Sequence, residues 1–428
     1  MKKVRLINSV SERNRPRCYF LFLLVLTQIL LYATWSSYVF HAGNRCQGKV
    51  STEQTNAKET HLSGHSEKRH IAFVKVHKAA STTVQNIFLR FAMQRDLLVV
   101  VPHVPKFFYP NIISLDDTVT SRNILPAPKN RSYDVLCCHV IYNRTAFERI
   151  MPSDTVYIGI IRDPFDHFKS ALHYFRPKSV FEIADPFPVS RFLQNPKFYN
   201  KGSSSSFLDN RMAFEYNFPS HLFQTRNNTE IRQYILKLDT EFQLIIVVEL
   251  FDESMILMRR LMNWKFKDLL YLKQNVRIKR EMEFNFNPGD AYLHQRWDEL
   301  DYALYDHFYR RLQAQLREQG PDIHEEVLYF KRLRRDIEFF CQNMHNPGSY
   351  ASFYVTTSRW SDSFVVTKRD CHYMTIPEIS FIKEIRMKQY GYFRDLPQLD
   401  KPKEALWQNV MRFADGNISV NQAKFASY

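Results

Sequence analysis

Short apolar segments alternate with segments of helical periodicity along most of this chain. Strand-like runs occupy residues 70–76 (HIAFVKV), 133–140 (YDVLCCHV), 155–161 (TVYIGII) and 242–250 (FQLIIVVEL). Apolar residues recur every three or four positions in the segments that follow, at residues 83–94, 165–175 and 252–264. Strands that alternate with helices predict an α/β fold in which helices flank a central parallel sheet.

The later part of the chain is richer in helical patterns than in strands. Residues 297–319 and 325–341 both carry apolar side chains at helical spacing. The basic run KRLRR at residues 331–335 is interpreted as a solvated helix face. The loop KGSSSS at residues 201–206 is too short to separate domains, so we expect one folded body over residues 70–428 with a helix-rich C-terminal half.

The N-terminal residues follow a different pattern. Residues 18–40 contain no charged side chain, and this run is long enough for a membrane-spanning helix. Basic residues dominate the segment before it. A cleaved signal peptide is the alternative, but its apolar core would be shorter, roughly 7–15 residues. Residues 41–69 are polar and indicate a flexible stem. The chain is therefore predicted to have a cytoplasmic tail (1–17), a single transmembrane signal anchor (18–40), a stem (41–69) and a lumenal domain (70–428).

Glycosylation sequons and cysteines agree with a lumenal body. The sequons lie at Asn130, Asn143, Asn227 and Asn417. An oxidising compartment would permit a Cys341–Cys371 disulfide, although spacing alone does not establish the pairing. The chain has no CxxC pair and no histidine cluster with zinc spacing, so we expect no metal.

The charge balance favours an acidic partner. The formal net charge is +15 and the sequence pI is near 9.4. Nucleic acid, an anionic membrane or a phosphorylated or sulfated ligand would each suit such a surface, and a generally basic surface without such a partner is the alternative.

The turn KVHKAASTT, residues 75–83, has the layout of a phosphate-binding turn between a strand and a helix. Lys78 adds a positive charge, and Ser81, Thr82 and Thr83 add hydroxyl donors, with Ser81 or Thr82 able to cap the helix. The glycines of GxxxxGK[ST] are missing, which argues against metal-dependent ATP hydrolysis but not against a 5'-phosphate. A simple helix cap with exposed lysines is the alternative.

Polar residues follow two further strands. The third strand ends at Arg162, where a second phosphate could be held, and Asp163 and Pro164 suit the start of a helix that carries Ser170. An arginine paired with a nearby acid is the alternative. The second strand ends at His139, whose imidazole could take a proton from a hydroxyl, and His77 in the turn is the other candidate base.

Together these segments resemble the galactose-3-O-sulfotransferase family. The resemblance is carried by FVKVHKAASTT, LCCHVIYN, IIRDPFDHFKSALHYF and VVELFDESMILMRRLMNWKFKDLLYLK, and CHYMTIPEISFIKEI resembles the family's C-terminal segment. The chain departs from the commoner residues of the family at Val76, Ala79, Cys138 and Lys169. The changes beside His139 leave the acceptor's identity open.

The resemblance implies a P-loop-like sulfotransferase fold with 3'-phosphoadenosine 5'-phosphosulfate as co-substrate and no required metal. The implied contacts to its 5'-phosphosulfate come from Lys75, Lys78, Ala79, Ala80, Ser81, Thr82 and Thr83, and those to its 3'-phosphate from Arg162 and Ser170. His139 is the implied base, with His77 as the alternative, and Lys78 would stabilise the leaving group.

The resemblance also implies a Golgi enzyme, a single-pass type II membrane protein with its catalytic domain in the lumen. It would sulfate a galactose hydroxyl, expected to be O3, on a glycolipid such as galactosylceramide or on a glycoprotein glycan. The alternatives are an enzyme similar to glycosaminoglycan 2-O-sulfotransferases and a non-catalytic glycan-binding protein anchored in the membrane. We expect a galactosyl acceptor and no nucleic acid as partner, and a homodimer is left open.

Overall fold

The computed structural model describes residues 66–103, 110–200, 206–272, 284–346, 348 and 350–391. The predicted tail, membrane anchor and most of the stem, together with Asn417, lie outside the described residues. Within the described residues no helix is long and apolar enough to cross a membrane.

A four-stranded parallel sheet forms the centre of the fold. Its strands are β1 (Ile71–Phe73), β2 (Val135–Leu136), β3 (Val156–Ile161) and β4 (Leu244–Val247), in the order β2-β1-β3-β4. Every residue of these strands is buried, as expected for a parallel sheet covered on both faces. The predicted α/β fold is confirmed, although each strand is shorter than its apolar run.

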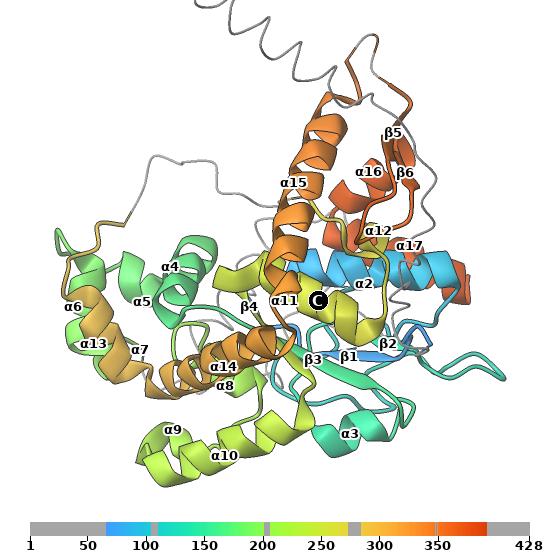
Figure 1. Cartoon of the computed structure of the whole chain (residues 1–428). Coiled ribbons are helices and arrows are strands. Elements are labelled where there is room, and N and C mark those ends of the chain that lie inside the picture. Colours follow the sequence, from blue (N-terminus) through green and yellow to red (C-terminus); the bar gives the residue numbers. More distant parts are fainter. Residues whose placement is uncertain are drawn as a thin grey trace, which may run out of the picture. The chain divides into compact units, whose positions relative to one another are not determined.

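Helices cover both faces of the sheet (Figure 1). On the upper face in that view lie α2 (Ser81–Arg95) and α11 (Phe251–Met262), and on the lower face lie α3 (Arg144–Glu148) and α10 (Asn228–Glu241). The long helices α14 (Glu299–Glu318) and α15 (Asp322–Asn343) follow and make the later half helix-rich, as predicted. The short elements around them are α8 (Arg211–Glu215), α9 (Leu222–Thr225), η2 (Val248–Leu250) and α12 (Phe266–Leu269).

A group of helices beside the sheet has its own hydrophobic cluster. It comprises α4 (Pro164–Phe175), α5 (Lys178–Phe181), α6 (Pro188–Gln194), α7 (Pro196–Asn200) and α13 (Asp290–Trp297). Phe168, Phe192 and Trp297 are buried at its centre. Asp163 caps α4 through the backbone N–H of Asp166 and Pro164 takes the first helical position, both as predicted.

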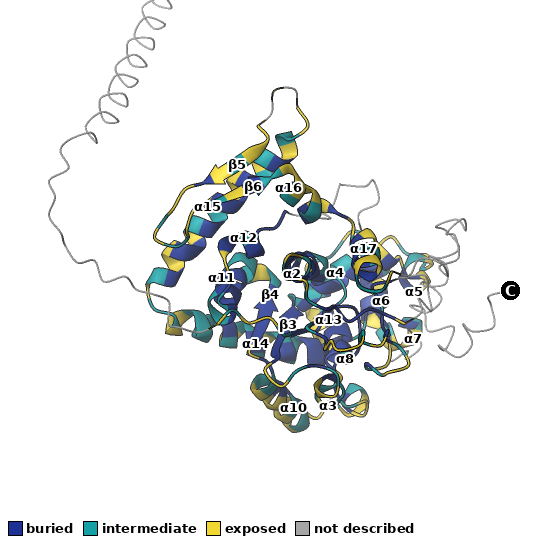
Figure 2. Ribbon diagram, turned by 90° about the vertical axis from the view of Figure 1, so that its right-hand side faces the viewer, coloured by how far each residue is buried: buried dark blue, intermediate teal, exposed yellow. Residues whose placement is uncertain are grey.

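The C-terminal part returns to the start of the sheet. It consists of a β-hairpin of β5 (Ser352–Val355) and β6 (Phe364–Thr367), followed by α16 (Lys368–Thr375) and α17 (Glu378–Tyr390). Helices α16 and α17 both pack against α2, and Figure 2 shows α17 beside it. The Cys341–Cys371 disulfide, with Cα atoms 5.4 Å apart, joins α15 to α16, so the pairing that the sequence permitted but did not establish is present.

Two predictions about exposure need correction. Leu333 and Arg334 are buried, so the basic run at residues 331–335 is not a wholly solvated face. The folded body also begins before residue 70, because Lys68 donates its N–H to the Met262 carbonyl at 3.0 Å and accepts from Trp264 Nε1 at 2.9 Å. Contacts with α11 and with Trp264 just after it explain the buried Arg334 and the ordered Lys68. These contacts join segments that are distant in sequence, so local sequence does not reveal them.

The sequons occupy different local settings. Asn130 is exposed, whereas Asn143 and Asn227 cap α3 and α10 by accepting backbone N–H bonds. Glycosylation at these three positions stays a prediction.

Candidate active site

The predicted site residues meet at the carboxyl ends of the strands. The turn of residues 75–80 follows β1, His139 follows β2, and Arg162 follows β3. Strand β1 lies between β2 and β3, so the chain changes direction across the sheet at this point. Open α/β sheets bind their ligands at such a switch point.

The turn reaches its shape without glycine. Lys78 and Ala80 have φ values of 59° and 54°, in the left-handed region that glycine usually occupies. A residue with a Cβ pays roughly 1–2 kcal/mol for this conformation. Other contacts must therefore hold the turn in place.

Side-chain donors supply those contacts. Four successive carbonyls of the turn each accept a hydrogen bond. His139 Nδ1 donates to the Lys75 carbonyl at 2.9 Å, and Ser81 Oγ donates to the Val76 carbonyl at 2.6 Å. His167 Nε2 donates to the His77 carbonyl at 2.8 Å, and Arg162 Nη1 donates to the Lys78 carbonyl at 3.1 Å. Except for Ser81, these donors come from segments far along the chain. The fold as a whole thus imposes the strained backbone, as is usual at functional sites.

The backbone N–H groups of the turn are left available. His77 donates its N–H to Glu215 Oε2 at 2.8 Å, but the N–H groups of Lys78, Ala79 and Ala80 have no acceptor among the described residues. Successive free N–H groups at a helix N-terminus form an anion-binding concavity. Ala79 is fully buried, so it can contribute only its backbone.

The predicted helix cap is wrong. The N-cap of α2 is Ala80, which makes no side-chain cap, and Ser81 lies inside the first turn with its hydroxyl directed to the Val76 carbonyl. Thr82 donates its hydroxyl to Glu378 Oε2 at 2.9 Å. A negative ligand at the free N–H groups could take the place of the missing cap. Thr83 is half-buried beside them, and its donor contact stays a prediction.

Lys78 carries a positive charge that no carboxylate neutralises among the described residues. Its Nζ lies 3.5 Å from the centre of the Tyr174 ring. Burial, followed by the charges of Arg162 and Lys75, lowers the pKa of Lys78 to about 8. An anionic ligand would favour the charged form and relieve this effect.

The resemblance implies 3'-phosphoadenosine 5'-phosphate as the product of the donor, and we expect its binding to depend on pH. As pH rises through about 8, free Lys78 loses its proton, and the affinity should fall by up to about tenfold per pH unit. Isothermal titration between neutral and alkaline pH would measure this, and proton uptake on binding should show as a dependence on the buffer's ionisation enthalpy. Lys78→Arg keeps its charge and should flatten the profile; an equally steep profile in that variant would assign the effect to another group.

Arg162 shapes the turn, and its predicted contact to a second phosphate stays a prediction. Its Nη1 holds the Lys78 carbonyl, while its Nε is buried without a partner among the described residues. Ser170 lies half-buried on α4, two turns beyond Pro164. An unpartnered guanidinium nitrogen is the kind of donor that a phosphate would satisfy.

The two candidate bases are stacked on each other. The ring centroids of His77 and His139 lie 3.7 Å apart at an angle of 18°. Burial is the main factor that lowers the pKa of both well below the usual range, and the charge of Lys75 adds to it in each case. Both imidazoles are therefore neutral near pH 7, which is the form that a general base requires.

Their hydrogen bonds differ. His139 uses both nitrogens, since Nδ1 donates to the Lys75 carbonyl and Nε2 accepts from Lys75 Nζ at 2.7 Å. His77 Nδ1 bonds Glu215 Oε1, and its Nε2 has no partner among the described residues. Glu215 is held in turn by Arg211 at 2.8 Å. This arrangement orients His77 as a carboxylate orients a catalytic histidine.

Lys75 does not face the predicted ligand. Its side chain is 1% exposed, and its Nζ lies 2.9 Å from Glu378 Oε1 as well as beside His139. The predicted donor contact of Lys75 is replaced by a buried ion pair.

Sequence reasoning missed Glu215, Glu378, His167 and Asn111. All contact the turn or its neighbours. His167 and Glu378 lie in segments that carry the family resemblance, but nothing in those segments marked these two side chains as part of the site. Only the fold brings them together, because they come from α8, α17, α4 and the segment before β2.

A metal is a further chemical option for this cluster. Ligand atoms of His77, His139 and Glu215 lie within 4.8 Å of one another. The hydrogen bonds already described engage both nitrogens of His139 and join His77 Nδ1 to Glu215, so the cluster is arranged for proton transfer. That no metal is needed stays a prediction.

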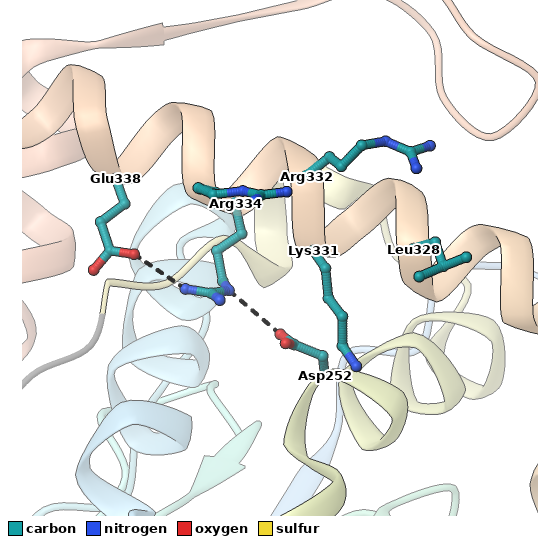
Figure 3. Close-up of a pocket in the computed structure, with 7 residues that line it drawn as sticks. Asp252, Leu328, Lys331, Arg332, Arg334 and Glu338 are labelled. Atoms are coloured by element: carbon teal, nitrogen blue, oxygen red, sulfur yellow. Dashed lines mark hydrogen bonds and ion pairs between the residues drawn. The ribbon is translucent and has the colours of Figure 1, made fainter.

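A separate pocket of about 590 Å³ opens between α11 and α15 (Figure 3). It is lined by Asp252, Leu328, Lys331, Arg332, Arg334, Arg335 and Glu338. Arg334 pairs with Asp252 and Glu338, and Lys331 pairs with Glu253. None of the predicted site residues lines this pocket, and much of its charge is already neutralised.

The fold and the site define an α/β protein that presents an anion-binding turn and a histidine pair at the carboxyl ends of a parallel sheet. The galactose-3-O-sulfotransferase family model matches residues 9–348, which include every site residue described above except Glu378. The chain belongs to the galactose-3-O-sulfotransferase family.

Individual relatives agree with this assignment. Mouse galactose-3-O-sulfotransferase 3 is 32% identical over 244 residues, 56% of this chain and 55% of the relative. Pig galactose-3-O-sulfotransferase 2 is 29% identical over 283 residues, 63% of this chain and 68% of the relative. Human galactosylceramide sulfotransferase is 28% identical over 263 residues, 59% of this chain and 60% of the relative. The chain thus spans about half the length of the first of these relatives.

Proposed function

We propose that this protein transfers a sulfuryl group from 3'-phosphoadenosine 5'-phosphosulfate to a hydroxyl of galactose. One observation carries the proposal: the free N–H groups of the turn, Lys78 and Arg162 converge beside the His77–His139 pair. The N–H groups, Lys78 and Arg162 provide the positive charge and the hydrogen-bond donors that a phosphosulfate needs. The histidine pair can take a proton from the acceptor hydroxyl. Family membership supports the reaction class.

The donor would be held at two places. The N–H groups of residues 78–80 and the Lys78 ammonium would bind the 5'-phosphosulfate, and Arg162 with Ser170 would bind the 3'-phosphate. The buried, unpartnered Arg162 Nε and the unused N–H groups fit such a ligand. Positioning and electrostatic stabilisation would then supply most of the catalysis.

We assign the base role to His77 rather than to His139. The galactose oxygen would form a bond to sulfur while its proton passes to His77 Nε2. The sulfur–oxygen bond to the phosphate would break, and its electron pair would remain on that oxygen in the departing bisphosphate. Lys78 would stabilise this charge, and Glu215 would stabilise the imidazolium formed on His77.

The finer features of the protein are part of the same proposal. They are O3 as the sulfated position, a galactosylceramide-like or glycoprotein acceptor, and a Golgi type II membrane location with a lumenal catalytic domain. The Cys341–Cys371 disulfide supports an oxidising compartment, and the relatives' names support a galactosyl acceptor.

A panel of acceptors tests the function. The full-length chain would be incubated with ³⁵S-labelled donor and galactosylceramide, a β-galactosyl N-glycan or heparan sulfate, and the sulfated position mapped. Transfer to galactose O3 is expected. Transfer to the polymer alone would favour a glycosaminoglycan enzyme, and glycan binding with neither transfer nor donor-product binding would favour a non-catalytic protein.

Arg162→Ala should weaken binding of 3'-phosphoadenosine 5'-phosphate by about 10–100-fold, because a charge-assisted contact is lost. The Lys78 carbonyl also loses its donor, so part of the loss reflects a looser turn. Isothermal titration gives the affinity. Arg191→Ala, an exposed arginine on α6, serves as control, and an Arg162 variant with the control's affinity would refute the assigned phosphate contact.

A further inference from the structure

Glu378 joins segments of the site that are distant in sequence. Glu378 is the first residue of α17. Its Oε1 accepts hydrogen bonds from Lys75 Nζ at 2.9 Å and from Asn111 Nδ2 at 2.5 Å. Its Oε2 accepts a hydrogen bond from Thr82 Oγ1 at 2.9 Å. These donors belong to the turn after β1, the segment before β2 and the first turn of α2. A carboxylate at a helix N-terminus is also favoured by the helix dipole.

Both of the Oε1 partners hold His139. Lys75 Nζ bonds the imidazole Nε2 at 2.7 Å, and the Asn111 carbonyl accepts the backbone N–H of His139 at 2.9 Å. Because His139 stacks on His77, the position of Glu378 is transmitted to the proposed base. The Oε2 partner, Thr82, begins the helix whose N-terminus faces the donor.

We propose that Glu378 is a positioning residue of the transfer reaction: it fixes His139 against His77 through Lys75 and Asn111, and fixes the start of α2 through Thr82. This inference rests on the proposed function of the same site. On this proposal, helix α17 contributes to the active site through Glu378, although Glu378 bonds neither His77 nor His139 directly.

The charge of Glu378 is secure at neutral pH. Burial opposes the charge, but the Lys75 ammonium and the hydrogen bonds from Lys75 and Asn111 outweigh it and lower the pKa of Glu378 to about 2. The other charged or titratable groups that act on the two histidines are Glu215, Arg211, Lys78 and His167. Glu378 is thus the carboxylate that neutralises Lys75, and Glu215 serves His77.

Glu378→Gln keeps the size of the side chain and removes the charge. In the full-length chain we expect kcat to fall on the order of 10²-fold, because small displacements of catalytic groups have effects of that size. The affinity for 3'-phosphoadenosine 5'-phosphate should change much less. Glu384→Gln is the matched control, since Glu384 lies on the same helix, is half-buried and, among the described residues, bonds only the Tyr373 hydroxyl, at 2.6 Å.

A double variant separates positioning from stability. Lys75→Met or Glu378→Leu alone leaves a buried charge without its partner and should lower Tm, whereas the two together remove the pair and should recover much of it. A positioning role predicts that the stable double variant remains nearly inactive. Recovery of activity together with Tm, or a Glu378→Gln variant as active as Glu384→Gln, would overturn the proposal.

The failure of the proposed function would look different. If the wild-type chain transfers no sulfuryl group to any acceptor, the function fails. The coupling of Lys75 and Glu378 in Tm is measured without turnover, and its absence would remove the ion pair on which this inference depends.

Discussion

Replacing His77 by alanine is expected to lower kcat by about 10²–10⁴-fold, the usual contribution of a general base. Binding of 3'-phosphoadenosine 5'-phosphate should be nearly unchanged, because the turn offers the donor N–H groups and Lys78 rather than the imidazole. Single-turnover rates with labelled donor, together with isothermal titration of the product, give the two quantities separately.

His77 is preferred as the base because, within the described structure, its ring has a nitrogen that is free to accept a proton, whereas the ring of His139 does not. His77 Nδ1 is bonded to Glu215, so Nε2 is left to accept a proton, whereas Lys75 occupies Nε2 of His139. Glu215→Gln should also lower kcat, since an amide cannot stabilise the imidazolium as a carboxylate does. Its effect should be smaller than that of His77→Ala.

Comparison variants test whether His77 rather than His139 is the base. His70→Gln, at the other end of β1 and paired with Asp154 at 2.6 Å, should behave as wild type. His139→Ala should reduce activity less than His77→Ala, because its role is to support the neighbouring ring. A larger loss in the His139 variant, with His77→Ala still active, would return the base role to His139.

Lys78→Met is expected to lower kcat by about 10²–10³-fold, as seen when one donor that stabilises transition-state charge is removed. Lys78 has no carboxylate partner in the described part of the chain, and its burial beside Arg162 makes its charge effective. Donor-product affinity should fall as well, since in the proposed mechanism the ammonium also contacts the phosphate.

Lys237→Met controls for the loss of one positive charge from a basic protein. Lys237 is exposed on α10 and makes a 3.8 Å ion pair with Glu241, so its loss should leave kcat unchanged. Lys78→Arg should recover part of the binding but not all of the rate. If Lys78→Met matched the Lys237 variant, the leaving-group role would be wrong.

The sheet and its order of strands and helices could be predicted from sequence because the apolar runs of buried parallel strands are strong local signals. The hairpin of β5 and β6 was missed, since its residues are mostly exposed or half-buried and lack such a run. The buried Arg334 was missed because its partner Asp252 becomes a neighbour only when α11 packs on α15.

The candidate site was predictable in its positions but not in its contacts. Strand ends correctly placed His77, Lys78, His139 and Arg162 at one edge of the sheet. The contacts of Lys75 and the different roles of the two histidines depend on Glu378 and Glu215. Neither acid is adjacent in sequence to the residues it contacts, so no local pattern could have assigned them.

The contact between Thr82 and Glu378 spans 296 residues of chain, which has a consequence for biosynthesis. Contacts of such separation form late, after the loops between them have closed. During synthesis the turn after β1 leaves the ribosome long before α17, so it waits without the carboxylate that neutralises Lys75. A nascent or truncated chain that lacks α17 should therefore already contain the sheet and yet be inactive, which delays catalytic competence until α17 has been synthesised.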